Sequence, residues 1–194
     1  MENQKTLQVA LIQSALVWED PQANREAFEV KIKSIPNSVD MVILPEMFTT
    51  GFTMSPENID ESEGQATVEW MQQMAQKFKI AIVGSMVFQE KEKYYNRLYF
   101  AEPDGKLSFY DKRHTFTLAG EHKKYKSGKH KVLVDYKGFR FCPLICYDLR
   151  FPIWARNTDD YDVLIYVANW PKPRISAWDA LLKARAIENM AYCI

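Results

Sequence analysis

Short apolar segments alternate with amphipathic helical patterns along almost all of this chain, and this alternation restricts its fold more than any other feature. Segments such as Leu7–Gln13 and Asp40–Leu44 carry apolar residues at successive positions, which is typical of strands buried on both faces of a sheet. Some strands stand alone between helices, whereas others form hairpins, for example around Pro103-Asp104-Gly105. The pattern predicts an α/β layered sandwich with mixed sheets rather than a purely parallel, doubly wound sheet.

Helix boundaries are indicated by capping residues and by periodicity. Asp20 can cap a helix that has Pro21 at its first position, and the apolar residues of Thr67–Lys79 recur at helical spacing. A long polar loop is expected over Asp111–Lys129, and loops of that length in compact domains are usually functional or disordered. The expected strands cover residues 7–13, 40–44, 80–88, 94–101, 106–110, 131–135, 139–146 and 162–168, and the expected helices cover 20–35, 67–79, 150–156 and 175–190.

The end of the chain is unusual for a complete domain. After the helix over Ile175–Met190, the segment Met190–Ile194 is apolar and predicts the first residues of another strand. A strand that stops there would leave an unpaired sheet edge, so we expect a domain that is truncated at its C-terminus. The residues of the last helix that we expect to face inward are Trp178, Leu181, Leu182 and Ile187.

Composition narrows the function. The chain has 194 residues, so we expect residues 1–194 to form a single domain. Lys+Arg and Asp+Glu both number 25, which predicts no nucleic-acid or membrane partner. Met1–Lys5 is polar and lacks a signal-peptide core, so a cytosolic location with reduced thiols is expected. Cys142 and Cys146 have no further Cys or His that would complete a zinc site, and no metal is expected.

Three reactive side chains follow three of the expected strands. Glu46 comes after the strand that ends at Leu44, Lys112 follows the strand that ends at Tyr110, and Cys146 ends the apolar run from Phe139. Ligands of open α/β sheets collect at the carboxyl ends of strands. We therefore expect these three side chains to converge on one pocket.

The three residue types complement one another chemically. A thiol needs a base to become a thiolate, and a carboxylate in a dry pocket has a raised pKa that suits this task. A neighbouring ammonium group lowers the pKa of a thiol and can stabilise an oxyanion. Glu46, Lys112 and Cys146 could thus perform acyl transfer without histidine.

Three motifs resemble, in order and separation, the signatures of the nitrilase superfamily of carbon–nitrogen hydrolases. They are Leu44–Phe48, Tyr110–His114 and Cys146–Pro152. The resemblance implies an α-β-β-α sandwich and looks like the omega-amidase branch, which hydrolyses the terminal amide of 2-oxoglutaramate and 2-oxosuccinamate. Further matches lie at Phe48–Phe52, Val167–Pro171 and Ala184–Asn189.

The resemblance also implies a role for each matched residue. Glu46 would be the general base, Cys146 the nucleophile that forms a thioester, and Lys112 the oxyanion stabiliser, together with the backbone N–H of Tyr147. Glu121 matches the second glutamate of the family, which orients the lysine. No metal or organic cofactor is implied, and the family pattern favours a homodimer.

The substrate implied by this resemblance is a small amide that carries a carboxylate. Asn169 and Trp170 match the loop that lines the family's pocket, and Phe48, Phe52 and Phe116 are expected to form its walls. The substrate carboxylate requires a cation; Arg113, Arg150 and Arg174 are candidates, and Arg150 also fits an ion pair behind the nucleophile.

Two other interpretations remain open at the level of sequence. The same three reactive residues occur throughout the superfamily, so the substrate could be another amide, a carbamoyl compound or a nitrile. The early end of the chain also fits an inactive fragment that acts only as a binding protein. A substrate panel and the reactivity of Cys146 distinguish these possibilities.

Overall fold

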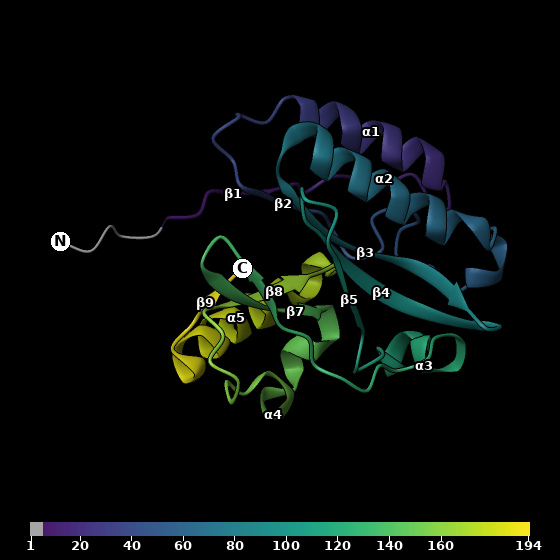
Figure 1. Cartoon of the computed structure of the whole chain (residues 1–194). Helices are drawn as coiled ribbons and strands as arrows, with labels where there is room; N and C mark the ends of the chain where they lie inside the picture. Colours follow the sequence, from purple (N-terminus) through teal and green to yellow (C-terminus); the bar gives the residue numbers. More distant parts are fainter. Residues whose placement is uncertain (1–5) are drawn as a thin grey trace.

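The computed structural model describes residues 6–194, which form two sheets that face each other (Figure 1). The first sheet has five strands in the order β1-β2-β3-β4-β5, and the second has four in the order β6-β7-β8-β9. The first three strands run parallel and β3, β4 and β5 antiparallel; β6 is antiparallel to β7, and β7, β8 and β9 are parallel. The strands are β1 (Val9–Leu11), β2 (Met41–Ile43), β3 (Ala81–Glu90), β4 (Lys93–Ala101), β5 (Leu107–Asp111), β6 (Val134–Tyr136), β7 (Phe139–Ile145), β8 (Val163–Val167) and β9 (Tyr192–Cys193).

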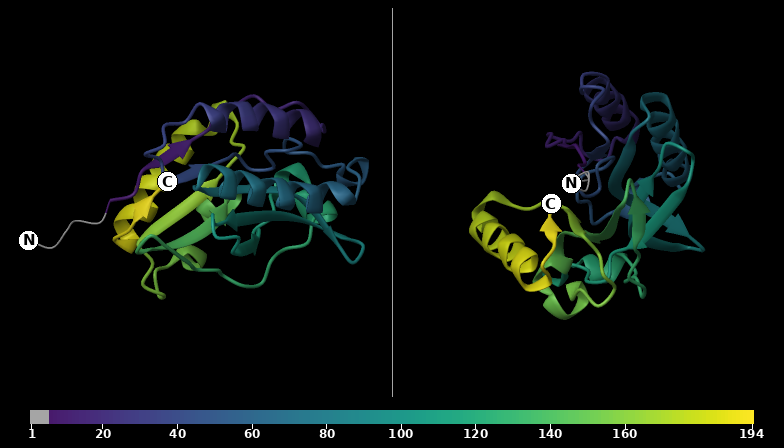
Figure 2. Two further views of the ribbon diagram at one scale, coloured as in Figure 1. Left: turned by 45° about the horizontal axis from the view of Figure 1, so that its top comes forward. Right: turned by 60° about the vertical axis from the view of Figure 1, so that its left-hand side comes forward.

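Helices cover the outer faces of the two sheets. Figure 2 shows α1 and α2 over the first sheet and α5 on the opposite side of the molecule, beside the second sheet. The expected sandwich with mixed sheets is therefore confirmed. The helices are α1 (Pro21–Lys33), α2 (Ser62–Phe78), α3 (Glu121–Lys124), α4 (Pro152–Ala155) and α5 (Ile175–Asn189), and the 3-10 turns are η1 (Pro56–Asn58), η2 (Thr117–Ala119), η3 (Cys146–Arg150) and η4 (Lys172–Arg174).

The apolar run of β2 shows why both faces of the first sheet are buried. Met41 and Ile43 pack in the core between the two sheets. Val42 and Leu44 point the other way and pack with Phe28 of α1 and other apolar residues under α1 and α2. Because successive side chains of a strand alternate between faces, a run without polar residues fits only this position between two apolar layers.

Two helix starts illustrate how local sequence sets the element boundaries. Asp20 Oδ1 accepts a hydrogen bond of 3.0 Å from Ala23 N, and Pro21 begins α1, as expected. Helix α2 begins at Ser62, earlier than the sequence indicated, and the Ser62 N–H donates to Asp60 Oδ1 at 2.9 Å. The first turn of α2 is largely polar, so the apolar stripe that predicted this helix appears only from Thr67 onward.

The inward face of α5 differs from the expected one. Ile187 is 78% exposed, whereas Trp178, Leu181 and Leu182 pack against the core between the sheets. The inward stripe continues instead through Arg185, whose Nε and Nη2 donate to the Leu149 carbonyl at 3.0 and 2.7 Å. The prediction for Ile187 was therefore wrong, because a buried arginine that satisfies a backbone carbonyl takes the inward position.

The last described strand confirms the strand expected over Met190–Ile194. β9 pairs in parallel with β8, with Val163 opposite Tyr192 and Leu164 opposite Cys193. The start Met1–Lys5, for which the sequence predicts no signal peptide, lies outside the described residues. Within residues 6–194, no helix combines the length and the apolar character that crossing a membrane requires.

Candidate active site

Glu46, Lys112 and Glu121 form a fully buried ionic cluster. Lys112 Nζ donates to Glu46 Oε1 at 2.8 Å and to Glu121 Oε2 at 2.9 Å, and all three side chains are 0% exposed. Glu46 follows β2, Lys112 follows β5, and Glu121 begins α3 within the long polar segment Asp111–Lys129. The first sheet and the loop that follows β5 thus bring together residues that are far apart in the sequence.

Asn96, in the middle of β4, joins the two glutamates. Its Nδ2 donates to Glu46 Oε1 at 2.9 Å and to Glu121 Oε1 at 3.1 Å. Sequence reasoning missed this residue, since β4 was interpreted only as a hairpin strand. The sequence did contain one signal, an asparagine inside a strand that was expected to be buried. A buried side-chain amide without hydrogen-bond partners costs free energy, so such a residue indicates polar neighbours.

The second carboxylate oxygen of Glu46 accepts a hydrogen bond from the segment that follows β8 of the second sheet. Asn169 N donates to Glu46 Oε2 at 3.0 Å. Ile145 of β7 lies opposite Val167 of β8, so the two parallel strands end side by side. Cys146 and the segment that contains Asn169 therefore leave the second sheet at the same edge.

Cys146 is the first residue of η3 and follows directly after β7. Its φ is 42°, in the left-handed region that non-glycine residues rarely adopt. The carboxylate of Glu46 lies close enough to the Cys146 thiol to contribute to raising its pKa. Because the first N–H groups of a helix lack partners inside it, the N–H of Tyr147 is available at the start of η3.

Asp148 stabilises the turn that contains Cys146 through hydrogen bonds to its buried carboxylate. The carboxylate is completely buried and accepts from Ile145 N at 3.1 Å, from Tyr110 OH at 2.8 Å and from His114 N at 2.9 Å. The His114 ring Nδ1 also lies 2.8 Å from Asp148 Oδ1. Asp148 thus ties the turn of the cysteine to the segment that follows Lys112. Sequence reasoning had assigned it no role of its own.

We expect Asp148→Asn to destabilise the protein by about 1–3 kcal/mol, because one of its oxygens becomes an amide nitrogen that cannot accept these hydrogen bonds. Turnover should also fall at least about tenfold, since small displacements of a nucleophile are costly. Thermal unfolding and steady-state kinetics measure the two effects. The exposed Asp135, paired with Arg140 at 2.9 Å, gives the matched control Asp135→Asn. Equal melting temperatures for the two variants would contradict this role of Asp148.

Opposing effects determine the charge of the buried cluster. Burial disfavours the ammonium form of Lys112, but the carboxylates of Glu46 and Glu121 outweigh it, and the pKa of Lys112 is raised. Burial raises the pKa of Glu121, although Lys112 acts in the opposite direction. The lysine therefore stays positively charged and is held between two acidic groups.

The thiol of Cys146 does not have the lowered pKa that a neighbouring ammonium would suggest. Burial, followed by the nearby Glu46 carboxylate, raises its pKa well above the ordinary value of 9.0, and Lys112 offsets this only in part. The side chain of Cys146 is thus a protonated thiol next to a carboxylate. Such a thiol depends on its base for reactivity.

This electrostatic arrangement predicts the pH dependence of Cys146 alkylation. A raised thiol pKa means that the alkylation rate should still increase above pH 9, whereas an exposed thiol levels off near its ordinary pKa. Glu46→Gln removes a negative charge, so the thiol pKa falls and the profile moves to lower pH. Iodoacetamide labelling of Cys146, followed by peptide mass spectrometry across pH, measures both profiles. A Glu46→Gln profile at higher pH than wild type would contradict the argument.

A cavity of about 510 Å³ opens in front of Cys146. Most of the side chains around it are apolar or aromatic, as is usual for small-molecule sites. Phe116 packs against the ring of Tyr147, with ring centroids 5.0 Å apart. The cavity is lined by four residues that the sequence predicted to surround the substrate, Phe52, Phe116, Asn169 and Trp170, and by Tyr147, whose N–H was expected to contact the oxyanion.

Phe48 does not line this cavity, which corrects the expectation that it forms a wall. Its N–H donates to Ser85 O of β3 at 2.9 Å, and its side chain faces α1 and α2. The ring is completely buried and packs against Phe28 and Trp70, with ring centroids 5.5 and 5.8 Å apart. Backbone hydrogen bonding to β3 continues beyond Glu46 as far as Phe48. This pairing directs the Phe48 ring toward the face of the first sheet that α1 and α2 cover.

Comparison with known proteins agrees with this geometry. The carbon-nitrogen hydrolase family model matches residues 8–194. The chain is 47% identical over 186 residues to the omega-amidase YafV of Escherichia coli strain K12, an alignment that covers 96% of this chain and 72% of that protein. It is 34% identical over 191 residues to the 2-oxoglutaramate amidase of Bacillus subtilis strain 168, covering 95% of this chain and 73% of that protein.

A solved structure shares the fold. It is XC1258 from Xanthomonas campestris, a CN-hydrolase superfamily protein with an arsenic adduct in its active site. The two sequences are 39% identical and the TM-score is 0.92, and the match covers 96% of this chain and 74% of that protein. The family model, the relatives and the fold agree with the resemblance of the three motifs. The chain therefore belongs to the carbon–nitrogen hydrolase family, within the nitrilase superfamily.

Proposed function

We propose that this protein is an omega-amidase, which hydrolyses the terminal amide of a short 2-oxo acid such as 2-oxoglutaramate to the acid and ammonia. The observation that carries the proposal is the buried Glu46–Lys112–Glu121 cluster beside Cys146, at the base of a cavity of small-molecule size. The similarity to proteins named omega-amidase and 2-oxoglutaramate amidase supports this choice of substrate.

The first half of the proposed reaction forms a thioester. Glu46 takes the thiol proton as the sulfur of Cys146 attacks the amide carbon, and a C–S bond forms. The carbonyl oxygen becomes an oxyanion, which Lys112 Nζ and the N–H of Tyr147 stabilise. When the tetrahedral intermediate collapses, the C–N bond breaks, and the proton held by Glu46 passes to the leaving nitrogen to give ammonia.

The second half releases the acid. Glu46, again ionised, takes a proton from a water molecule whose oxygen attacks the thioester carbon. The C–S bond then breaks, and the proton returns to the sulfur. Glu121 acts as a positioning residue, because it forms a second ion pair with the ammonium group of Lys112 beside that of Glu46. The residues assigned to these steps need no metal or organic cofactor.

The substrate class is a small-molecule amide. We also propose that residues 1–194 form a single hydrolase domain and that it works as a homodimer in the cytosol. Support for a single domain comes from the shared core between the two sheets. Three free cysteines fit a reducing compartment, and the dimer rests on the family pattern.

The test is ammonia release from 2-oxoglutaramate by this chain, beside a panel that contains a neutral amide, a carbamoyl compound and a nitrile. We expect the highest kcat/KM for 2-oxoglutaramate. Faster turnover of a nitrile or carbamoyl compound would assign the site to another reaction of the superfamily. Lack of turnover of every compound by folded protein would support a binding protein instead.

A further inference from the structure

The side-chain amide of Asn96 closes a ring of hydrogen bonds with the buried ionic cluster. Its Nδ2 donates to Glu46 Oε1 at 2.9 Å and to Glu121 Oε1 at 3.1 Å. Lys112 Nζ donates to the same two oxygens, at 2.8 and 3.1 Å. Each of these carboxylate oxygens therefore accepts one hydrogen bond from the ammonium group and one from the amide.

The register of β4 places this amide between the two sheets. Leu98 and Phe100 follow Asn96 at every second position of the strand and pack in the core between the sheets. The N–H of Lys112 donates to the backbone carbonyl of Asn96 at 3.0 Å, so the asparagine lies beside the lysine. The Asn96 side chain is buried and is not among the described residues that line the cavity. Asn96 therefore acts on the glutamates and does not contact a substrate.

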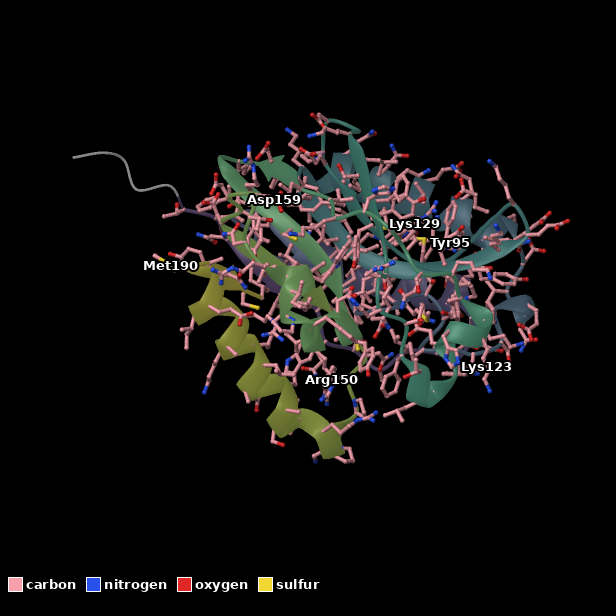
Figure 3. The ribbon with its side chains drawn as sticks, turned by 90° about the horizontal axis from the view of Figure 1, so that it is seen from below. Tyr95, Lys123, Lys129, Arg150, Asp159 and Met190 are labelled. Atoms are coloured by element: carbon pink, nitrogen blue, oxygen red, sulfur yellow. The ribbon has the colours of Figure 1, made fainter. Side chains whose placement is uncertain are left out.

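Backbone pairing between β4 and the end of α3 brings Glu121 to the same amide. Tyr94 of β4 forms a parallel bridge with Tyr125, directly after α3. In the view of Figure 3, Tyr95 of β4 and Lys123 of α3 lie on the same, right-hand side of the molecule. The first residue of α3 is Glu121, so this pairing holds its carboxylate next to β4.

The cluster contains more negative than positive charge. Two carboxylates, Glu46 and Glu121, share the single ammonium group of Lys112, which leaves a net charge of −1 when all three are ionised. Burial and, to a smaller extent, the neighbouring Glu46 raise the pKa of Glu121, whereas Lys112 opposes them. Uptake of a proton by the cluster is therefore favoured. The two N–H donors of a neutral amide oppose it, because they stabilise both anions.

Two further titratable groups act on the cluster from neighbouring elements. They are the thiol of Cys146 in η3 and the phenol of Tyr125 after α3. Burial is the main reason why the pKa of each is raised, so both groups are neutral near pH 7. Neither supplies positive charge to the two carboxylates, which depend on Lys112 and on hydrogen-bond donors.

Asn96 is an unfavourable residue for packing alone. Its Oδ1 is buried and has no hydrogen-bond partner in the described part of the chain. A buried acceptor without a partner costs free energy, and a leucine of similar volume would avoid this cost. An aspartate of the same shape would add a third negative charge to the cluster. The two N–H donors are therefore the property that distinguishes asparagine at this position.

We propose that Asn96 is a positioning residue for the general base, because its two N–H donors keep Glu46 and Glu121 ionised together and fix Glu46 Oε1 on the side of Lys112. The other oxygen, Oε2, accepts from the N–H of Asn169, which lines the cavity. Oε2 is thus the oxygen left to take the thiol proton. This inference rests on the proposed role of Glu46 in the amidase reaction.

The first test follows proton transfer from the thiol without amide hydrolysis. With 4-nitrophenyl acetate, the sulfur of Cys146 forms a C–S bond to the acetyl carbon and the ester C–O bond breaks. Glu46 takes the thiol proton, and 4-nitrophenolate leaves as a coloured anion. Its release gives the second-order acylation rate after the rate of Cys146→Ala is subtracted. The rise of this rate from acidic to neutral pH reports ionisation of the base.

We expect Asn96→Leu to move this rise to higher pH by about one pH unit or more, because the ionised carboxylates lose hydrogen bonds. On the acidic side of the profile, the rate should fall about tenfold. The matched control is Asn189→Leu, since Asn189 is also buried but its Nδ2 donates to the Arg185 carbonyl at 2.9 Å. The control should lower the melting temperature without moving the profile. A profile of Asn96→Leu that coincides with wild type would overturn the proposal.

A second background tests whether the amide serves both carboxylates. Glu121→Gln removes one anion, so adding Asn96→Leu to it should give less than about half of the shift seen in the wild-type background. Equal shifts in the two backgrounds would contradict the shared amide. Asn96→Ser keeps one O–H donor and should give an intermediate shift. It carries the test if Asn96→Leu does not fold, and a Asn96→Ser profile equal to wild type would then overturn the proposal.

Kinetics with 2-oxoglutaramate separate this inference from the proposed function. Asn96→Leu should lower kcat at acidic pH and leave KM within about twofold, because Asn96 does not line the cavity. A raised KM with unchanged kcat would contradict a positioning role. If the Asn96 variants shift acylation as expected but no amide is hydrolysed, the proposed function fails and the role of Asn96 stands. If amides are hydrolysed and neither profile moves, only the role of Asn96 fails.

Discussion

Replacing Cys146 with alanine should abolish amide hydrolysis, with kcat reduced by at least about a thousandfold, while the protein still folds. The sulfur is the atom that would bond to the substrate carbon, and no other thiol lines the cavity among the described residues. The side chain is 9% exposed and the replacement removes a single atom from it, so stability should change by no more than about 1 kcal/mol. Ammonia release and thermal unfolding measure the two expectations.

Cys142→Ala provides the matched control. Cys142 lies on β7, four residues before Cys146, and is fully buried in the core between the sheets. Burial raises the pKa of its thiol to about 12, so it is a poor nucleophile. Cys142→Ala should retain turnover. Residual hydrolysis by Cys146→Ala at a level close to wild type would refute the thioester mechanism.

Replacing Lys112 with methionine should have the largest combined effect on activity and stability. The substitution leaves Glu46 and Glu121 facing each other in a fully buried site, with only Asn96 between them. Loss of one member of a buried ion pair typically costs about 3–5 kcal/mol, because the remaining charge is uncompensated. The oxyanion also loses its cation, so kcat should fall by about a hundredfold or more. Urea unfolding and single-turnover kinetics measure these losses.

A double variant separates these two effects of Lys112. In Lys112→Met/Glu121→Gln, the second buried negative charge is removed as well, so much of the lost stability should return. Activity should not return, since the oxyanion still lacks its cation. The single variant Glu121→Gln serves as the reference for the double-variant comparison. Equal stability of the single and double lysine variants would show that charge repulsion is not the source of the destabilisation.

The sequence alone predicted most of the elements and the position of each reactive residue along them. Apolar runs and helical periodicity are local signals, so the layered sandwich and its strands could be predicted without coordinates. Glu46, Lys112 and Cys146 could be proposed because each follows an apolar strand, and ligands of α/β sheets collect at the carboxyl ends of strands; that they come from two different sheets is visible only in the structure. The three motifs then specified the family.

The contacts between distant segments could not be obtained in this way. Asn96 looked like an ordinary strand residue, and its role depends on two glutamates that come from other elements. Phe48 lies two residues from the base but faces the helices, because backbone pairing with β3 sets its direction. Ile187 fitted an apolar helical face, yet Arg185 occupies the buried side through its bonds to Leu149.

What the sequence by itself determined is therefore the order of the elements and the family, together with the residues that we propose to react. The tertiary structure alone decided the charge state of the site and the choice of cations beside it. The pKa of Cys146 depends on burial and on Glu46, and the presence of Arg150 and Arg174 in the lining of the cavity depends on how separate segments of the chain meet there. The first property arises from short-range electrostatics and desolvation, and both depend on three-dimensional distances rather than on position along the chain.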